Sequence, residues 1–246
     1  MNENETMGKA IEVIDLVKKF GDFTANDRLT FHVQQGEIFG FLGANGAGKT
    51  TAIKILCGLS VPTSGKVVVA GYDVKTHPEM VKRNIGYMSQ KFSLYEDLSI
   101  YENIRLFGAI YGLRAKEIQI RSEQMLRKLG LLKEKKRLIK TLSLGWKQKL
   151  AFSVAIIHQP KIVFLDEPTS GVDPITRRQF WEMIYEAAEG GITVFVTTHY
   201  LDEAEYCNRV TMMANGSIKA IDTPRRLKEQ FECQTMNDVF LKLTRS

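Results

Sequence analysis

The sequence predicts an α/β fold built around a phosphate-binding loop. An apolar run from Glu37 to Leu42 leads into the glycine-rich stretch 43–50, and residues 51–59 then carry apolar side chains at helical spacing. Two further apolar runs, 161–165 and 192–196, have the length of buried parallel strands, and each ends in polar side chains. This order is typical of a parallel sheet whose ligands bind at the carboxyl ends of the strands.

Composition limits the class of protein. Apolar residues make up 44% of the 246 residues and charged residues 25%, the balance of a globular chain. No apolar run reaches the ~18 to 20 residues of a bilayer-spanning helix, and the start MNENETMGKA lacks the features of a secretion signal. Cys57, Cys207 and Cys233 suggest neither a disulfide framework nor a zinc site. We therefore expect a cytoplasmic protein. Its net charge of +6 fits nucleic acid, an anionic membrane surface or a phosphate-rich ligand.

Residues 43–50 predict phosphate binding. Glycines let backbone N–H groups wrap around β- and γ-phosphate oxygens, the helix that follows adds the positive end of its dipole, and Lys49 brings a mobile charge. The Thr50 hydroxyl is suited to bind Mg²⁺. A purely structural glycine-rich turn is the alternative. The residues expected to hold the nucleotide here are Gly43, Ala44, Asn45, Gly46, Ala47, Gly48, Lys49, Thr50 and Thr51.

Polar residues that follow the two later strands are candidates for catalysis. Asp166 is suited to hold Mg²⁺, and Glu167 to polarise the water that attacks the γ-phosphate. If the strands are parallel, His199 reaches the same edge of the sheet and contacts the γ-phosphate or the attacking water. The alternatives are a solvated turn for the acidic pair and a structural hydrogen bond for His199.

The remaining segments show simpler patterns. Residues 10–16 and 28–34 alternate apolar and polar side chains, as half-buried strands do. The region between Gln90 and Pro160 is predicted to be mostly helical, and Ser99 to Glu102 has the form of a capping box. Asn215-Gly216 indicates a type I′ hairpin, and two short helical patterns follow Thr223-Pro224.

In this order, the motifs closely resemble those of the ATP-binding cassette (ABC) family of ATPases over nearly the whole chain. The resemblance implies one ABC ATPase domain, 1–246, with a P-loop NTPase (RecA-like) core, an N-terminal antiparallel β subdomain and an inserted α-helical subdomain. The nucleotide-binding core with its β subdomain is expected in 1–92 and 157–221. The helical subdomain is expected in 93–156, and a C-terminal helical tail in 222–246.

The resemblance also assigns roles to single residues. Phe20 matches the aromatic residue that stacks on adenine, although a core aromatic is the alternative. Gln90 matches the glutamine that links Mg²⁺ and the attacking water to the membrane partner, with an exposed loop glutamine as the alternative. Asp173 lies in a stretch similar to the loop through which two subunits sense each other, and it also suits the start of a helix.

The family signature, usually LSGGQ, is matched by LSLGW at residues 142–146. Ser143 and Gly145 are retained, and the resemblance implies that they donate a hydroxyl and a backbone N–H to the γ-phosphate bound on the opposite subunit. Leu144 and Trp146 depart from the pattern, and we expect them to leave the ATP affinity of the monomer unchanged. With one phosphate loop and one signature, a chain needs a second copy or a close relative to complete its sites.

Segments 90–95, 170–174 and 197–207 look most like those of bacterial drug- and antibiotic-exporter ATPases. The resemblance thus implies an ATP- and Mg²⁺-dependent hydrolase that forms a homodimer, or a heterodimer with a related ATPase. Integral-membrane permease subunits would be its partners at the inner face of the cell membrane, with no nucleic acid expected. The alternatives are a soluble ABC ATPase acting on nucleic acid or ribosomes, and a nucleotide-binding regulator that barely hydrolyses.

Overall fold

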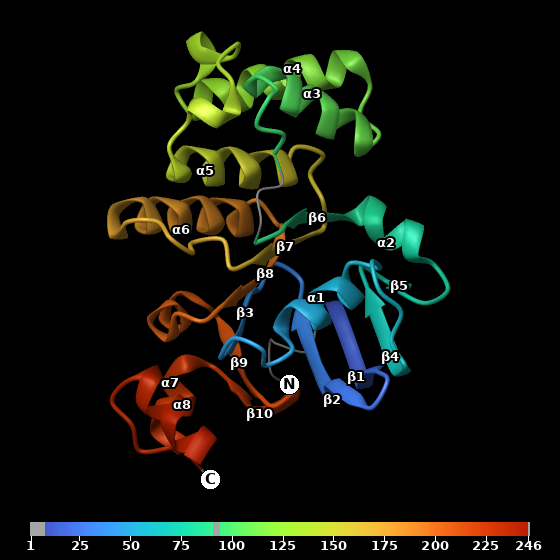
Figure 1. The fold of residues 1–246 in the computed structure, drawn as a ribbon, viewed down its shortest axis with the longest axis vertical. Coiled ribbons are helices and arrows are strands. Elements are labelled where there is room, and N and C mark those ends of the chain that lie inside the picture. Colours follow the sequence, from blue (N-terminus) through green and yellow to red (C-terminus); the bar gives the residue numbers. More distant parts are fainter. Residues whose placement is uncertain (1–7, 91–93, 246) are drawn as a thin grey trace.

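A computed structural model describes residues 8–90 and 94–245 (Figure 1). Helices α3, α4 and α5 gather at one end of the molecule, a largely parallel sheet occupies the middle, and α7 and α8 lie at the opposite end. An antiparallel sheet packs beside α1. The polar start, 1–7, and the expected boundary between core and helical subdomain at 92/93 lie outside the described residues.

The central sheet has six strands in the order β10-β9-β3-β8-β7-β6. From β9 to β6 neighbouring strands are parallel, and β10 returns antiparallel to β9. The turn between β9 and β10 places Asn215 at φ 50° and Gly216 at φ 74°, which confirms the predicted hairpin. The strands are β3 (Ile38–Gly43), β6 (Ile85–Met88), β7 (Ile162–Asp166), β8 (Thr193–Thr198), β9 (Arg209–Ala214) and β10 (Ser217–Asp222).

The second sheet is antiparallel, in the order β2-β1-β4-β5. The predicted strands 10–16 and 28–34 were too short, because both extend to a hairpin in which Phe20 pairs with Phe23. Register shifts along this pair, with Asp15 and Arg28 at positive φ, interrupt the alternation that the sequence pattern depends on. The strands are β1 (Lys9–Phe20), β2 (Phe23–Gln34), β4 (Ser64–Val69) and β5 (Tyr72–Asp73).

The helices begin and end at recognisable residues. The predicted capping box is confirmed at the start of α3, where the Ser99 amide donates to Glu102 at 2.8 Å. The helix after the glycine loop ends at Leu56 rather than at residue 59, and Gly58 at φ 68° turns the chain away. The helices are α1 (Lys49–Leu56), α2 (Pro78–Asn84), α3 (Ile100–Ile110), α4 (Ala115–Lys128), α5 (Leu144–Ala155), α6 (Pro174–Glu189), α7 (Pro224–Gln230) and α8 (Met236–Arg245).

Short 3₁₀ turns lie between α4 and α5, at Leu132–Glu134 and Ile139–Thr141, and between β8 and β9, at Leu201–Tyr206. Among the described residues, no helix combines the length and the apolar character that a bilayer crossing requires.

The hydrophobic core lies on both faces of the central sheet. In β7, Val163 and Leu165 belong to the hydrophobic cluster that contains side chains of α3, α5 and α6. Ile162 and Phe164 belong to the cluster that contains side chains of α1 and the antiparallel sheet. A strand buried on both faces needs a continuous apolar run, which explains why 161–165 shows no alternation. This two-sided burial, at about 1.5–3 kcal/mol for each large apolar side chain, fixes the strand ends at which the site lies.

Candidate nucleotide-binding and catalytic site

The glycine loop connects β3 to α1 and closely approaches other backbone segments. A Cβ atom on Gly48 would lie 2.4 Å from the Ala25 carbonyl oxygen, and one on Gly43 would lie 2.6 Å from the Met213 carbonyl oxygen. Gly46 and Gly48 have φ values of 81° and 100°, in the region that only glycine adopts without strain. The Gly216 amide donates to the Ala47 carbonyl at 3.2 Å, so the β9–β10 turn braces the loop.

Lys49 lies inside this loop and is only 4% exposed. Its Nζ donates to the Gly43 carbonyl at 2.8 Å and to the Ala44 carbonyl at 3.1 Å. Burial lowers the pKa of Lys49, and the Glu167 carboxylate, 3.5 Å away, opposes that shift. A buried ammonium among backbone carbonyls suits a phosphate, which would supply the negative charge that the loop lacks.

Thr50 and Asp166 face each other, with 3.5 Å between Oγ1 and Oδ1. Asp166 also accepts a hydrogen bond from the Thr197 hydroxyl at 2.7 Å, and burial raises the pKa of its carboxyl. Hydroxyl and carboxylate oxygens are ligands that Mg²⁺ prefers. The described residues contain no group of three or more His, Cys, Asp or Glu side chains that could hold a metal. This pair therefore fits an ion that keeps water and phosphate oxygens among its ligands.

Glu167 is held from several directions at the end of β7. Its amide donates to the Thr197 carbonyl at 3.1 Å, and its side chain is 8% exposed. The Gln90 Nε2 donates to Oε2 at 2.9 Å, and the His199 Nδ1–H donates to the same oxygen at 3.0 Å. The acidic pair is thus buried and not a solvated turn. Gln90, Glu167 and His199 come from the neighbouring strand ends of β6, β7 and β8, as the parallel sheet requires.

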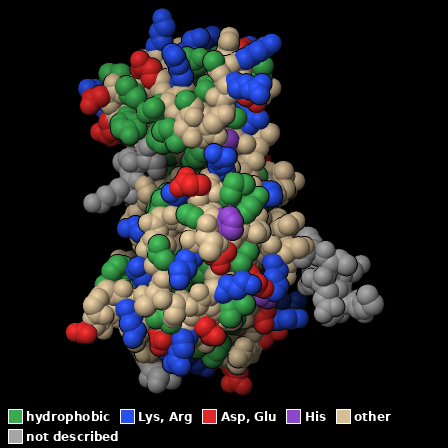
Figure 2. Space-filling model, turned by 90° about the vertical axis from the view of Figure 1, so that its right-hand side faces the viewer, with side chains coloured by type: hydrophobic (Ala, Val, Ile, Leu, Met, Phe, Trp, Pro, Cys, Tyr) green, Lys and Arg blue, Asp and Glu red, His purple; other side chains and the backbone are tan. Residues whose placement is uncertain are grey.

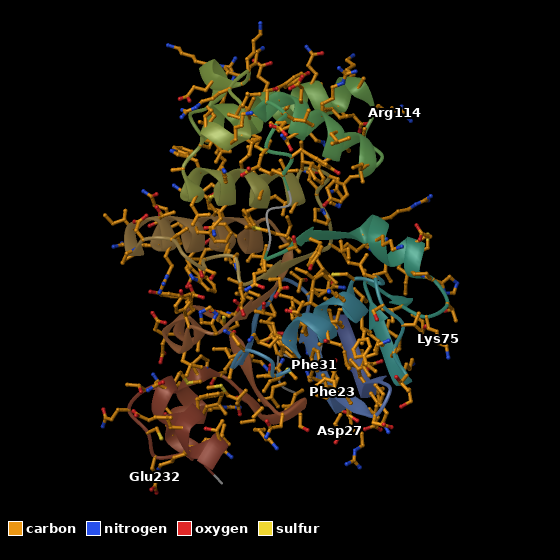
Figure 3. All side chains as sticks on the ribbon, viewed as in Figure 1. Phe23, Asp27, Phe31, Lys75, Arg114 and Glu232 are labelled. Carbon is orange, nitrogen blue, oxygen red and sulfur yellow. The ribbon has the colours of Figure 1, made fainter. Side chains whose placement is uncertain are left out.

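A cavity of about 410 Å³ opens beside the loop. It is lined by Phe23, Ala25, Asn45, Gly46, Gly48, Lys49, Thr50, Thr51, Gln90 and Glu167. Phe23, which the sequence pattern missed, lies on β2 (Figure 3) and presents a 66% exposed side chain. Phe20 pairs with it across the hairpin and is 56% exposed, so it is not a core aromatic. Stacking of Phe20 on adenine stays a prediction, and Phe23 joins it as a candidate.

The predicted signature lies at the start of α5. Ser143 is exposed and precedes the helix, and Leu144 and Trp146 are each 37% exposed. A Cβ atom on Gly145 would lie 2.5 Å from the Thr176 Cγ2 on α6. Packing within the chain therefore requires a glycine here. The expected contacts of Ser143 and Gly145 with a nucleotide on another subunit stay predictions.

Asp173 caps α6. Its carboxylate accepts hydrogen bonds from the Ile175 and Thr176 amides at 3.1 and 3.0 Å, and from the Thr176 hydroxyl at 2.6 Å. The bond from the hydroxyl and the bond from the Thr176 amide lower the pKa of Asp173. The predicted helix start is confirmed. Its role between subunits stays a prediction, which capping does not exclude.

A buried lysine inside a glycine loop, facing a carboxylate that Gln90 and His199 orient, defines an ATPase of the P-loop class. The profile of the ABC transporter family matches residues 26–170. This chain belongs to that family.

Similar proteins extend this match over nearly the whole chain. "Probable multidrug ABC transporter ATP-binding protein YbhF" of Escherichia coli (strain K12) is 47% identical over 238 residues, which cover 95% of this chain. Because they cover 41% of YbhF, the chain spans less than half of that relative. "Linearmycin resistance ATP-binding protein LnrL" of Bacillus subtilis (strain 168) is 34% identical, with 96% of this chain and 79% of LnrL covered.

A solved structure described as the ATP-binding subunit of an ABC transporter has the same fold. It superposes with a TM-score of 0.86 at 31% sequence identity, and the match covers 96% of this chain and 99% of that one. The α/β architecture with an antiparallel sheet and an inserted group of helices is thereby confirmed.

Proposed function

We propose that this chain binds and hydrolyses MgATP as the ATP-driven subunit of an exporter, and that closure of a dimer around the nucleotide drives the transport step. The observation that carries the catalytic part is the position of Glu167. Its carboxylate lies 3.5 Å from Lys49 and is oriented by Gln90 and His199. A carboxylate held in this way beside a phosphate loop can accept the proton of an attacking water.

In this proposal, different residues of the chain bind the phosphates, hold the metal ion and accept the proton. Loop amides and Lys49 bind the β- and γ-phosphates, and Lys49 stabilises the negative charge that develops on the transferred group. Thr50 and Asp166 would hold Mg²⁺, together with Gln90, which lines the same cavity as Thr50, and the ion would supply further charge neutralisation. Glu167 takes the proton from water, an effect of about 10²–10⁴ in rate for a positioned base. Gln90 and His199 keep its carboxylate in place.

A second subunit completes the site in this proposal. Ser143 and Gly145 lie at an exposed helix start and are the residues expected to meet a nucleotide on another chain. Each chain carries one phosphate loop and one such helix start, so two chains form two composite sites. The pair is a homodimer or a heterodimer with a related ATPase.

Export is supported by the relatives. YbhF is named as a probable multidrug transporter component and LnrL as a linearmycin resistance protein. We propose that permease subunits on separate polypeptides form the membrane channel, and that this chain docks on them at the inner face of the cell membrane.

The charge distribution gives little support to the nucleic-acid alternative. On the face drawn in Figure 2, Lys and Arg side chains are interspersed with Asp and Glu, and they form no single basic surface. Three basic residues near the signature pair with acids: Arg137 with Glu134 at 2.6 Å, Lys140 with Asp97 at 3.1 Å, and Lys147 with Glu96 at 2.6 Å. A nucleic-acid site needs basic side chains that are available to phosphates.

The test is ATP hydrolysis measured across protein concentration. Specific activity should rise with concentration, because the active form is a dimer. Ser143→Ala should reduce activity at every concentration, whereas Ser153→Ala, on the same helix with its hydroxyl bonded to the Lys149 carbonyl, should not. Binding of ATP with no hydrolysis at any concentration would instead favour the regulator.

A further inference from the structure

The start of α5 is tied to the turn that carries Glu167 within the same chain. The Gln148 Nε2 donates to the Ser170 carbonyl at 3.2 Å, and the Ser170 amide donates back to the Glu167 carbonyl at 3.2 Å. One helical turn earlier, the Leu144 side chain lies over Gly171, 3.5 Å from where a Cβ atom would be. A hydrogen bond and a side-chain contact therefore connect the helix that follows Ser143 to the turn that follows Glu167.

Gln148 is an unusual residue to find buried. It is 7% exposed, and its Oε1 has no partner among the described residues. Leaving a buried amide oxygen unpaired costs on the order of 1–3 kcal/mol, so a residue used only for packing would be apolar. The orientation of the amide follows from the Ser170 carbonyl, which requires a donor.

A polar cavity of about 310 Å³ adjoins this amide. Gln148 shares its wall with Gln90, Glu167 and Ser170. The cavity lies between α5 and the ends of β6 and β7, and it has the volume and the polar groups that water molecules require. The Gln148 side chain thus borders the same space as the candidate base and its glutamine partner.

We propose that Gln148 is a positioning residue for Glu167 of its own chain, acting through the carbonyl of Ser170. One part of this inference rests on the proposed dimer. There the helix start of α5 meets the nucleotide held by the other chain, while Gln148 acts on the Glu167 of its own chain. Through Gln148, nucleotide binding at one composite site then affects the position of the Glu167 carboxylate in the other.

The first test replaces the amide with a group of similar shape. Gln148→Met keeps the length of the side chain but removes the donor. The control Gln179→Met makes the same substitution on the exposed surface of α6, where the side chain accepts a hydrogen bond from the Lys149 ammonium. We expect kcat to fall about 3- to 10-fold in Gln148→Met, the range for one hydrogen bond, while KM for ATP changes less than about 2-fold. Gln179→Met should match wild type in both values. A matching loss in both variants, or none in Gln148→Met, would overturn the proposal.

Mixed dimers separate action within a chain from action across the interface. A trace of active chain is mixed with an excess of Glu167→Gln chain, so that one site of each dimer turns over. With Gln148→Met on the trace chain, turnover should fall about 3- to 10-fold. With Gln148→Met on the excess chain, which supplies α5 to the active site, turnover should equal that of the mixture in which neither chain carries Gln148→Met. The reverse result would assign Gln148 to the partner's nucleotide and sink the proposal.

A third measurement does not need hydrolysis. Hydrogen–deuterium exchange of the nucleotide-free chain should show the Ser170 and Val172 amides exchanging several-fold faster in Gln148→Met than in Gln179→Met, because the turn loses its support. Unchanged exchange in this turn would contradict the proposal even in an inactive protein. A wild-type chain that does not hydrolyse ATP would count against the proposed function alone.

Discussion

The carboxyl edge of the central sheet and the start of α5 carry the two halves of the candidate site, and they are built in opposite ways. At the sheet edge, Lys49, Asp166 and Glu167 are each less than 10% exposed. An ion pair joins Lys49 to Glu167, and hydrogen bonds from Thr50 and Gln90 hold the two carboxylates. At the start of α5, Ser143 is exposed, and Leu144 and Trp146 are each 37% exposed. The first half is assembled by folding, whereas the second is left open for another molecule.

This difference separates two physical costs. The sheet edge buries charged groups whose pKa values are shifted by loss of solvent. Their burial lowers the free energy of unfolding, and the same groups are the ones expected to act on the nucleotide. The exposed signature side chains, Ser143 and Trp146, cost little in the folded monomer, since they remain in contact with water. Substitutions at the sheet edge should therefore change chemistry and stability together, and those at the exposed signature side chains should change association alone.

The largest expected effect is at the base. Glu167→Gln keeps the shape and the hydrogen-bonding capacity of the side chain but cannot take a proton, so kcat should fall by at least about 100-fold with ATP binding retained. The variant should also accumulate an ATP-bound dimer visible by light scattering. Glu182→Gln, on the exposed side of α6, serves as the control. Normal turnover by Glu167→Gln would remove this residue from the base role.

Gly145→Ala should lower the stability of the monomer although Gly145 belongs to the exposed half of the site, because this glycine is also needed for internal packing. The new methyl group would collide with Thr176 Cγ2, and overpacking at about 1–3 kcal/mol outweighs the ~0.5–1 kcal/mol gain in helix propensity. Urea unfolding should show the loss in the monomer.

The double variant Gly145→Ala/Thr176→Ser removes the colliding methyl group and provides the check. It should recover most of the lost free energy of unfolding, since the two positions are coupled. Equal losses in the single and double variants would point to the backbone of α5 instead.

Replacing Asp166 or Asp173 by asparagine should change the free energy of unfolding at pH 7.5 in opposite directions. The folded pKa of Asp166 is raised by burial, so its ionisation lowers stability as pH rises from about 4 through that folded pKa. Asp166→Asn should remove this fall and stabilise the nucleotide-free chain by about 0.5–2 kcal/mol at pH 7.5.

Asp173 behaves in the opposite way. Hydrogen bonds from the Thr176 hydroxyl and amide lower its folded pKa. The ionised carboxylate therefore stabilises the folded chain fully above the unfolded pKa, and this stabilisation is lost as pH falls through the folded pKa. Asp173→Asn should lower stability slightly at pH 7.5 and lose its effect in acid. Urea titrations of both variants between about pH 2.5 and 7.5 cover both pH ranges, and changes of equal sign at pH 7.5 would contradict this account.

The smallest expected effect is at Trp146. Its ring is 37% exposed, lies 5.0 Å from the Lys149 ammonium, and borders a groove of about 1020 Å³ between α4, α5 and α6. Trp146→Gln restores the usual family residue and should change monomer stability by about 1 kcal/mol or less. The Kd for ATP of the monomer should stay within about 2-fold of wild type. A large loss of either would show that the exposed half also supports the fold.

The common position of the buried residues at one edge of the sheet could be predicted from the sequence, because buried strands leave a strong pattern, whereas their roles stay predictions. Asp166, Glu167 and His199 each follow an apolar run, and parallel pairing brings those ends together. Phe23 escaped prediction because bulges in β1 and β2 hide the position of the hairpin. Gln148 and the contact of Gly145 with Thr176 could not be predicted, since each depends on a distance between segments that no periodicity encodes.

The brace on the glycine loop has a consequence for the order of folding during synthesis. Although the loop motif is complete at residue 50, the Met213 carbonyl packs on Gly43 and the Gly216 amide bonds to Ala47. A ribosome-bound chain that has not yet released the β9–β10 hairpin therefore carries the motif without its brace. Nucleotide affinity should appear late in translation, once the hairpin closes against a loop made more than 160 residues earlier.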